Sequence, residues 1–422
     1  MMQLTSGQRD FILAHEREDV RETALRFTRE DLPLLLTQIA GRQAAAKKIP
    51  SWYAESAIFY PPHLSLEQSS SELTARYKAS LVAEEREEAT GLNLTVANTL
   101  RSPAARKNGS FADPTGGMGV DFSFMARHFR EAVYVERNEE LCRIAEHNFG
   151  VLGLRNVAVR CVGAERFLEE TQPLDLIYLD PSRRDNAGRK LFRIADCTPV
   201  LPEIKPLLFK KSDRVMVKYS PMLDISLAVK SLGCVKAVHV VSVDNECKEL
   251  LFLLSEAEAA GDRPADEPLF IAVNLKRSGG REFFSFTAAQ EQNVTVTFAA
   301  EPGAYLYEPN ASILKAGAFR SVARMYGLRK LHVNSHLYTS DNWVEEFPGR
   351  AFRVEAFFTP NRKNTGRFSR ETKKANITVR NFPATVAEIR RKTGLENGGD
   401  TYLFATTLAG ERMVWIKCTK IR

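Results

Sequence analysis

The stretch from Gly109 to Asp121 constrains the fold more than any other part of this 422-residue chain. A short, mostly apolar run ends at Asp113, and a glycine-rich turn then leads into the helical pattern Val120 to Arg130. The turn contains Gly116, Gly117 and Gly119. This order predicts a strand, a loop and a helix, an arrangement that holds a nucleotide-like ligand against backbone N–H groups. A second run, Ala132 to Glu136, places an acid about 20 residues beyond the loop, where a ribose hydroxyl would be bound.

The loop lacks the features of two common nucleotide-binding motifs. A dinucleotide fingerprint needs a third glycine where this chain has Phe122, and a P-loop needs a Gly-Lys-Ser or Gly-Lys-Thr that is absent. Asp113, directly before the loop, would repel a phosphate but suits an ammonium or a sulfonium group. The sequence therefore predicts S-adenosylmethionine as the ligand, and the alternative is a glycine turn in another kind of α/β protein.

Alternating strands and helices follow the loop, as in a doubly wound α/β domain. The five predicted parallel strands are Gly109 to Asp113, Ala132 to Glu136, Val157 to Val162, Leu174 to Asp180 and Arg214 to Tyr219. A helix, Ile225 to Leu232, and a hairpin of Val235 to Val243 and Leu250 to Leu254 should complete the sheet. Right-handed crossovers bring the carboxyl ends of the parallel strands to one edge, where Asp113, Glu136 and Asp180 should converge.

The length of the chain predicts two to four domains. Residues 1–85 read as helices, with Ser69 and Glu72 as a capping box for the last of them. After the polar linker Ser255 to Pro268, a strand is predicted at Val294 to Ala299 and one helix from Ala311 to Tyr326. The predicted domains are an N-terminal helical domain (1–85), an α/β domain (86–258) and two small α+β domains (266–346 and 347–422).

The six cysteines include no Cys-x-x-Cys pair, and the N-terminus lacks a basic region followed by an apolar one. These features predict a reduced, cytoplasmic protein. The apolar runs are shorter than a membrane span, so no membrane partner is expected. His332 and His336 are four residues apart without a third ligand, so no metal site is predicted.

The positive charge is concentrated at the C-terminal end. Residues 350–422 contain 16 lysines and arginines but six acidic residues, whereas the rest of the chain carries a small negative charge. Within Asn361 to Lys374, cations surround Phe368, a composition that suits phosphate contacts and base stacking. The predicted RNA-binding residues are Arg362, Lys363, Arg367, Arg370, Lys373 and Lys374. A solvated basic loop is the alternative.

Residues 86–256 resemble the class I S-adenosylmethionine-dependent methyltransferases. Asp113 to Gly119 is similar to their first motif, Glu136 to their second and Asp180-Pro181 to their fourth. The whole chain resembles a subgroup with a ferredoxin-like insert and a THUMP-like C-terminal domain. Three motifs carry this second resemblance: Tyr307-Glu308-Pro309-Asn310, Lys315-Ala316-Gly317-Ala318-Phe319 and Arg380-Asn381-Phe382-Pro383. It implies a Rossmann-like sheet of seven strands with a reversed last strand, and an RNA substrate such as tRNA or rRNA.

The resemblance also implies roles for individual residues. Asp180, Pro181 and Arg183 form the predicted catalytic set, with Asp180 accepting a hydrogen bond from an acceptor N–H or O–H. Arg184 joins Arg183 as a candidate clamp for phosphate or carboxylate, and both residues can instead pair with nearby acids. The predicted cofactor-binding residues are Asp113, Pro114, Thr115, Gly116, Gly117, Gly119, Asp121, Glu136, Arg137, Ala164, Glu165 and Asp180.

The sequence favours an enzyme that methylates an RNA base at nitrogen. Neither Asp180-Pro181-Ser182 nor Tyr219-Ser220-Pro221 contains a thiol, so a cysteine adduct with a pyrimidine is disfavoured. Two alternatives remain open: a protein or small-molecule methyltransferase with an incidental basic tail, and a non-catalytic RNA-binding protein. The strand-end Tyr219 is interpreted as packed rather than as a base-stacking residue.

Overall fold

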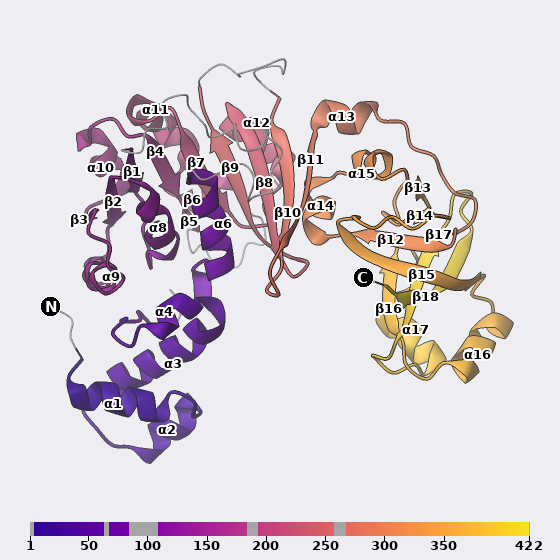
Figure 1. Ribbon diagram of the computed structural model, residues 1–422, viewed down its shortest axis with the longest axis horizontal. Helices are drawn as coiled ribbons and strands as arrows, with labels where there is room; N and C mark the ends of the chain where they lie inside the picture. The colour runs from indigo at the N-terminus through magenta and orange to yellow at the C-terminus, as the bar shows by residue number, and fades with distance from the viewer. Residues whose placement is uncertain (1–3, 63–66, 84–108, 184–192, 257–266, 422) are drawn as a thin grey trace. The chain divides into compact units, whose positions relative to one another are not determined.

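The computed structural model describes residues 4–62, 67–83, 109–183, 193–256 and 267–421. The chain divides into two compact units (Figure 1). The first contains residues 1–238 and 249–267, and the second contains residues 239–248 and 268–422. No helix in the described ranges is long and apolar enough to cross a membrane.

A twisted, mostly parallel sheet forms the centre of the first unit. Its strands follow the order β8-β9-β7-β4-β1-β2-β3, and β9 runs antiparallel to β7. The strands are β1 (Ser110–Asp113), β2 (Glu131–Glu136), β3 (Val157–Cys161), β4 (Leu176–Leu179), β7 (Val215–Tyr219), β8 (Val235–Val243) and β9 (Glu246–Leu254). The predicted Rossmann-like sheet with a reversed last strand is confirmed, but β10 (Leu269–Leu275) and β11 (Arg281–Thr287) extend it from the predicted seven strands to nine. Every residue of β4 and β7 is buried, as expected for central strands covered on both faces.

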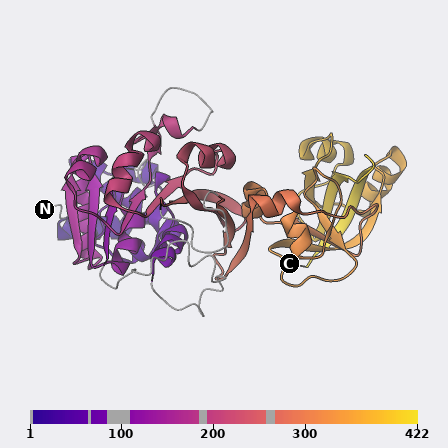
Figure 2. The same ribbon diagram turned by 90° about the horizontal axis from the view of Figure 1, so that it is seen from above.

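Helices lie on both faces of this sheet, as Figure 2 shows from above. They are α8 (Val120–Met125), α9 (Glu139–Val151), α10 (Ala164–Glu170), α11 (Leu201–Lys211) and α12 (Ile225–Leu232), with short 3-10 turns at Ala126–His128 and Ile194–Asp196. A two-stranded ribbon of β5 (Ser182–Arg183) and β6 (Cys197–Thr198) follows β4. Because β1, β2 and β4 are parallel, Asp113, Glu136 and Asp180 lie at one edge, as the sequence predicts.

The N-terminal part of the first unit is helical, as predicted. Its helices are α1 (Ser6–His15), α2 (Val20–Arg26), α3 (Leu32–Lys48), α4 (Pro50–Ala54) and α6 (Glu72–Val82). Ser71 caps α6, so the predicted capping box of Ser69 and Glu72 is wrong. The reason is that α6 begins at Glu72, so Ser71 is the capping residue, and the carboxylate of Glu72 accepts instead from the backbone N–H of Ser51.

The second unit contains the last two strands of this nine-stranded sheet and a separate sheet of its own. The strands β10 (Leu269–Leu275) and β11 (Arg281–Thr287) pair antiparallel, and β10 neighbours β8. A seven-stranded sheet has the order β13-β14-β12-β15-β18-β17-β16. Its strands are β12 (Tyr305–Pro309), β13 (Arg329–Lys330), β14 (Tyr338–Ser340), β15 (Gly349–Phe358), β16 (Asn376–Arg380), β17 (Thr401–Thr407) and β18 (Met413–Lys420). The helices of this unit are α13 (Ala288–Asn293), α14 (Ala311–Ala316), α15 (Ser321–Met325), α16 (Arg362–Glu371) and α17 (Val386–Thr393).

Two local predictions in the second unit are wrong. Residues 294–299 form only an isolated bridge between Phe298 and Lys330, because the neighbouring strand β13 has just two residues with which they can pair. The predicted helix 311–326 is two helices, since Gly317 adopts a left-handed φ of 86°. The basic stretch after Asn361 is the helix α16, whose first turn is capped by the side chain of Asn361, so the alternative of a basic loop does not hold.

Candidate active site

The glycine loop follows β1 and presents its backbone to open space. Gly117 has a left-handed φ of 53°, and a Cβ added there would meet nothing closer than 3.8 Å. Gly116 differs, because its Cβ would lie 2.2 Å from the ring of Tyr134. The loop therefore packs tightly against the sheet on one side and remains open on the other. A ligand can approach the backbone closely on the open side.

Glu136 closes the same site from the end of β2. One of its carboxylate oxygens accepts a hydrogen bond from the N–H of Gly117 at 3.0 Å. The other oxygen accepts from the N–H groups of Arg137 and Asn138, at 2.8 and 3.0 Å. The carboxylate is thus held in one orientation beside the loop and is not fully buried. A nucleoside bound at the loop would place its ribose hydroxyls against an acceptor of this kind.

Thr115 links the loop to the end of β4. Its N–H and its hydroxyl both donate to one carboxylate oxygen of Asp113, each at 2.9 Å, and its hydroxyl accepts from the backbone N–H of Asp180 at 2.7 Å. Asp113 is 2% exposed, and burial raises its pKa to about 8, although the hydrogen bonds from Thr115 oppose this. Asp113 therefore fixes the start of the loop through its hydrogen bonds with Thr115.

Asp180 forms an ion pair with Lys218, which belongs to β7. The ammonium nitrogen and a carboxylate oxygen are 2.6 Å apart, and the side chains of Asp180 and Lys218 are 38% and 10% exposed. Burial raises the pKa of Asp180 against the opposing effect of Lys218. Burial lowers the pKa of Lys218, but Asp180 and Asp121 outweigh it, so the net shift is upward. Lys218 is therefore an ammonium at neutral pH.

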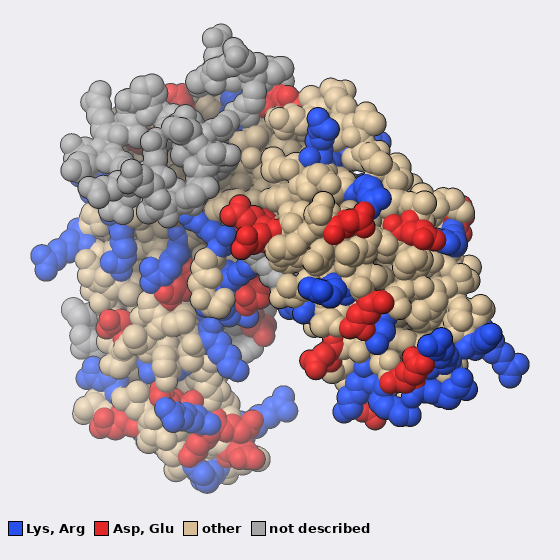
Figure 3. Space-filling model, turned by 45° about the vertical axis from the view of Figure 1, so that its right-hand side comes forward, with Lys and Arg blue, Asp and Glu red and all other residues tan. Residues whose placement is uncertain are grey.

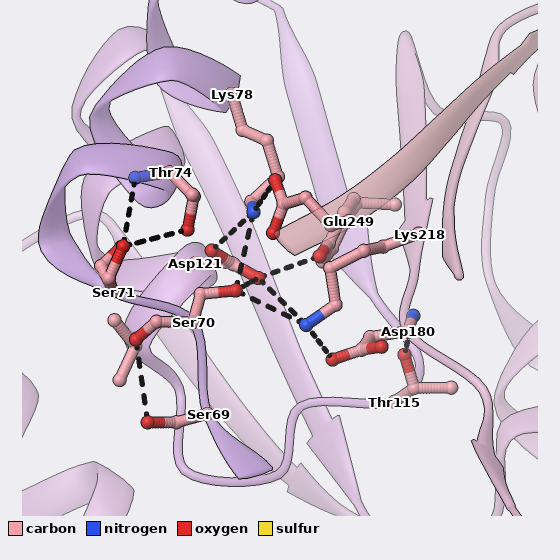
Figure 4. Close-up of polar contacts among 12 residues, drawn as sticks. Ser69, Ser70, Ser71, Thr74, Lys78, Thr115, Asp121, Asp180, Lys218 and Glu249 are labelled. Carbon is pink, nitrogen blue, oxygen red and sulfur yellow. Dashed lines mark hydrogen bonds and ion pairs between the residues drawn. The ribbon is translucent and has the colours of Figure 1, made fainter. Parts of the chain in front are cut away.

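The ion pair is one end of a chain of alternating charges beneath α6 (Figure 4). Lys78 of α6 lies 2.6 Å from Glu249 and 3.1 Å from Asp121, and Lys218 lies 3.7 Å from Asp121 on its other side. Ser70 donates to Asp121 at 2.7 Å and accepts from Lys78 and Lys218 at 3.3 and 3.2 Å. The order along the chain is Glu249, Lys78, Asp121, Lys218 and Asp180. We name these five residues and Ser70 the charge chain.

Two family models match the second unit. A ferredoxin-like domain model matches residues 305–348, and a THUMP-like domain model matches residues 349–420. A crystal structure of a "putative methyltransferase" from Porphyromonas gingivalis W83 shares 29% identity and a TM-score of 0.82, with all of both chains covered. The chain has the fold of a class I methyltransferase joined to ferredoxin-like and THUMP-like domains. We therefore call residues 109–256 the methyltransferase domain.

Two other solved structures match part of the chain. A Streptococcus mutans protein in complex with SAH shares 17% identity and a TM-score of 0.27, covering 35% of this chain and 90% of its own. An rRNA methylase from Streptococcus thermophilus shares 12% identity and a TM-score of 0.29, covering 43% and 94%. None of the curated proteins compared with the chain matches it.

The methyltransferase domain brings most predicted site residues to one edge. Asp113, Pro114 and the loop glycines lie beside Glu136, and Ala164 and Glu165 begin α10 after β3. Asp121 departs from its predicted place, because its carboxylate binds Ser70 and Tyr178 at 2.7 Å within the charge chain. Pro181 is buried, the backbone of Arg183 lies in β5, and Arg184 lies outside the described residues.

Sequence reasoning missed Lys78, Glu249 and Ser70 and assigned no role to Lys218. A signal for two of them was present. Lys78 lies among the buried face of α6, and Glu249 directly precedes the apolar run Leu250–Leu254. A charged residue in such a place needs a buried partner of opposite charge. The sequence does not show which partner it meets, because the pairs join segments up to 171 positions apart.

The charge chain should contribute strongly to the stability of the first unit. Lys78→Met removes an ammonium that is fully buried between two carboxylates. We therefore expect the free energy of unfolding to fall by about 3–5 kcal/mol. The measurement is the urea midpoint by circular dichroism, with amide protection of α6 by hydrogen exchange. The exposed Lys47→Met is the control and should change little. Adding Glu249→Leu to Lys78→Met should recover part of the lost free energy of unfolding, because it removes the carboxylate left without its partner. If the effects of the two single substitutions simply added, the pairing of Lys78 with Glu249 would be contradicted.

The predicted RNA-binding residues lie together in the THUMP-like domain. All six are exposed, four of them on α16 and two directly after it. Figure 3 shows lysine and arginine side chains gathered at the end of this unit. Phe368 is 4% exposed and packs against Phe358 and Trp415, so it is a core residue and the prediction that it stacks on bases is wrong.

Proposed function

We propose that the chain is an S-adenosylmethionine-dependent methyltransferase that modifies RNA. The observation that carries this proposal is the convergence of the open loop backbone, Glu136 and Asp180 at one sheet edge. The match of the THUMP-like model to residues 349–420 and the exposed cations of α16 support RNA as the substrate. We place the activity in the cytoplasm, in keeping with six free cysteines.

The residues present fit the methyl donor. The backbone of Gly117 faces open space, the carboxylate of Glu136 lies beside it, and both groups suit a nucleoside. When bound, S-adenosylmethionine supplies a methyl group on a positively charged sulfur. The chain must then hold the acceptor in line with that methyl group, and such positioning is worth about 7–11 kcal/mol of the barrier. Asp180 is the group that we assign to the acceptor.

The acceptor atom follows from the surroundings of Asp180. The sequence favours a base nitrogen, whose N–H would donate to the carboxylate. The carboxylate is already paired with Lys218 at 2.6 Å. Any acceptor group that donates to Asp180 therefore lies beside an ammonium group. A protein or small-molecule substrate is the second hypothesis from the sequence, and no observation of the described residues favours it over RNA.

The donor site is tested by binding. Glu136→Ala removes the acceptor for the ribose and the support of the Gly117 N–H, so we expect affinity for S-adenosylmethionine to fall about 10-fold to 100-fold. Isothermal titration calorimetry measures this without RNA. Glu131→Ala, at the opposite end of the same strand, is the matched control and should bind normally. Equal affinity of the wild type and Glu136→Ala would remove Glu136 from the donor site.

A further inference from the structure

The charge chain opens to solvent at one end only. The side chains of Lys78, Glu249, Asp121 and Lys218 are at most 10% exposed, whereas that of Asp180 is 38% exposed. Asp180 also directly follows β4, at the edge where the donor loop lies. The buried charges therefore end at the sheet edge where the donor loop lies, with Lys218 next to Asp180.

A structural role alone does not explain this arrangement. Burying charges costs several kcal/mol per ion, and well-packed apolar residues of similar volume are often equally or more stabilising. A chain of five ionisable side chains, three of which are joined through Ser70, thus needs a further reason. At the solvent-exposed end of the charge chain, these charges hold Lys218 as an ammonium next to the carboxylate of Asp180.

An ammonium in this position distinguishes between acceptor atoms. A neutral nitrogen that attacks a methyl group gains positive charge in the transition state, and a nearby ammonium opposes this. A hydroxyl oxygen gains negative charge as its proton leaves, and a donor fixed at that point stabilises it.

We propose that the acceptor is a ribose hydroxyl of RNA, with Lys218 as the catalytic ammonium and Asp180 as the proton acceptor. This inference rests on the proposed function. The acceptor oxygen forms a bond to the methyl carbon while the carbon–sulfur bond breaks and its electron pair stays on sulfur. The hydroxyl proton passes to the carboxylate of Asp180 and from there to solvent. Lys218 donates a hydrogen bond to the oxygen and keeps its own protons. Lys78, through Asp121 and Ser70, is a positioning residue for Lys218.

The product of the wild-type protein tests the proposal directly. RNA from cells that lack the gene is incubated with the full chain and methyl-labelled donor, then hydrolysed with alkali. A methylated 2′-hydroxyl cannot attack the adjacent phosphate, so we expect the label in alkali-resistant dinucleotides with the methyl group on the sugar. Label in mononucleotides with the methyl group on the base would overturn the hydroxyl acceptor and leave the proposed function intact. No label in RNA would instead contradict the proposed function.

Variants test Lys218 by its titration in the free protein, by turnover and by donor affinity. In the free protein, the Cε resonance of Lys218 should stay at its charged position to a higher pH than that of the exposed Lys230. Asp180→Asn should lower the pKa of Lys218, because it removes the nearest negative charge. Lys218→Met should reduce methyl transfer at least 100-fold while donor affinity changes less than threefold, and Lys230→Met should do neither. A Lys218 that titrates like Lys230, or a Lys218→Met with normal turnover, would overturn the role of Lys218.

Discussion

Asp180→Asn should reduce methyl transfer by about 10²-fold to 10⁴-fold while leaving donor affinity within a few fold of the wild type. The substitution keeps the size of the side chain and the backbone N–H that donates to Thr115, so the donor loop stays anchored. It removes the carboxylate that accepts the proton of the acceptor group, and a positioned general base is worth a factor of this size. Single-turnover kinetics with labelled donor give the chemical rate, and calorimetry gives donor affinity.

The matched control for this substitution is Asp175→Asn. Asp175 precedes β4 at the other end of the strand, where its carboxylate accepts from the N–H of Ser110. Like Asp180→Asn, this change neutralises an acid next to the same strand, but it lies at the edge away from the donor loop. We expect turnover close to the wild type. If Asp180→Asn retained turnover within a few fold, Asp180 would have no catalytic role and the ion pair with Lys218 would be structural.

The fold of the methyltransferase domain was predictable because local pattern and topology agree there. Apolar runs of strand length alternate with helical segments, and parallel pairing then fixes which strand ends meet. The boundaries of α12 match the prediction, since Asp224 caps its start and Gly233 follows its end. The prediction of a strand at residues 294–299 was wrong, because strand propensity cannot show how long the pairing partner is, and β13 offers only two residues.

The candidate site was predictable only where its residues belong to sequence motifs. Glu136 and Asp180 follow strands of the alternating pattern, so their convergence could be inferred. Lys78 reaches the site from a helix that lies outside that pattern, and only tertiary packing brings it to Glu249. Phe368 shows the opposite error. Its basic neighbours are typical of an RNA-binding surface, but its ring lies on the inner face of α16, against Trp415.

Neutralising the basic surface of α16 should weaken RNA binding and lower its salt dependence. Six residues are replaced by glutamine, four on α16 and two directly after it: Arg362, Lys363, Arg367, Arg370, Lys373 and Lys374. Arg367 pairs with Glu371 at 2.9 Å and Lys374 with Glu396 at 3.2 Å, so these two should contribute less. Each phosphate contact on a single strand contributes about 0.7 to the slope of log affinity against log salt concentration. Loss of the other four cations should therefore reduce the magnitude of this slope by about 3. Glutamine favours helices nearly as well as arginine and lysine, so α16 should persist.

Substitution is a sharper test than deletion of the basic segment. Removing residues 350–422 would take away nearly all of β15, which pairs with β12, and would expose the edge of β12. The matched control neutralises six exposed cations of the first unit: Arg9, Arg17, Arg21, Lys47, Lys210 and Lys230. Both variants lose the same net charge, so a difference between them reports where RNA binds rather than a general effect of charge. Donor affinity should be unchanged in both. If the α16 variant kept the affinity and slope of the wild type, α16 would not contact RNA, and a protein or small-molecule substrate would become the better hypothesis.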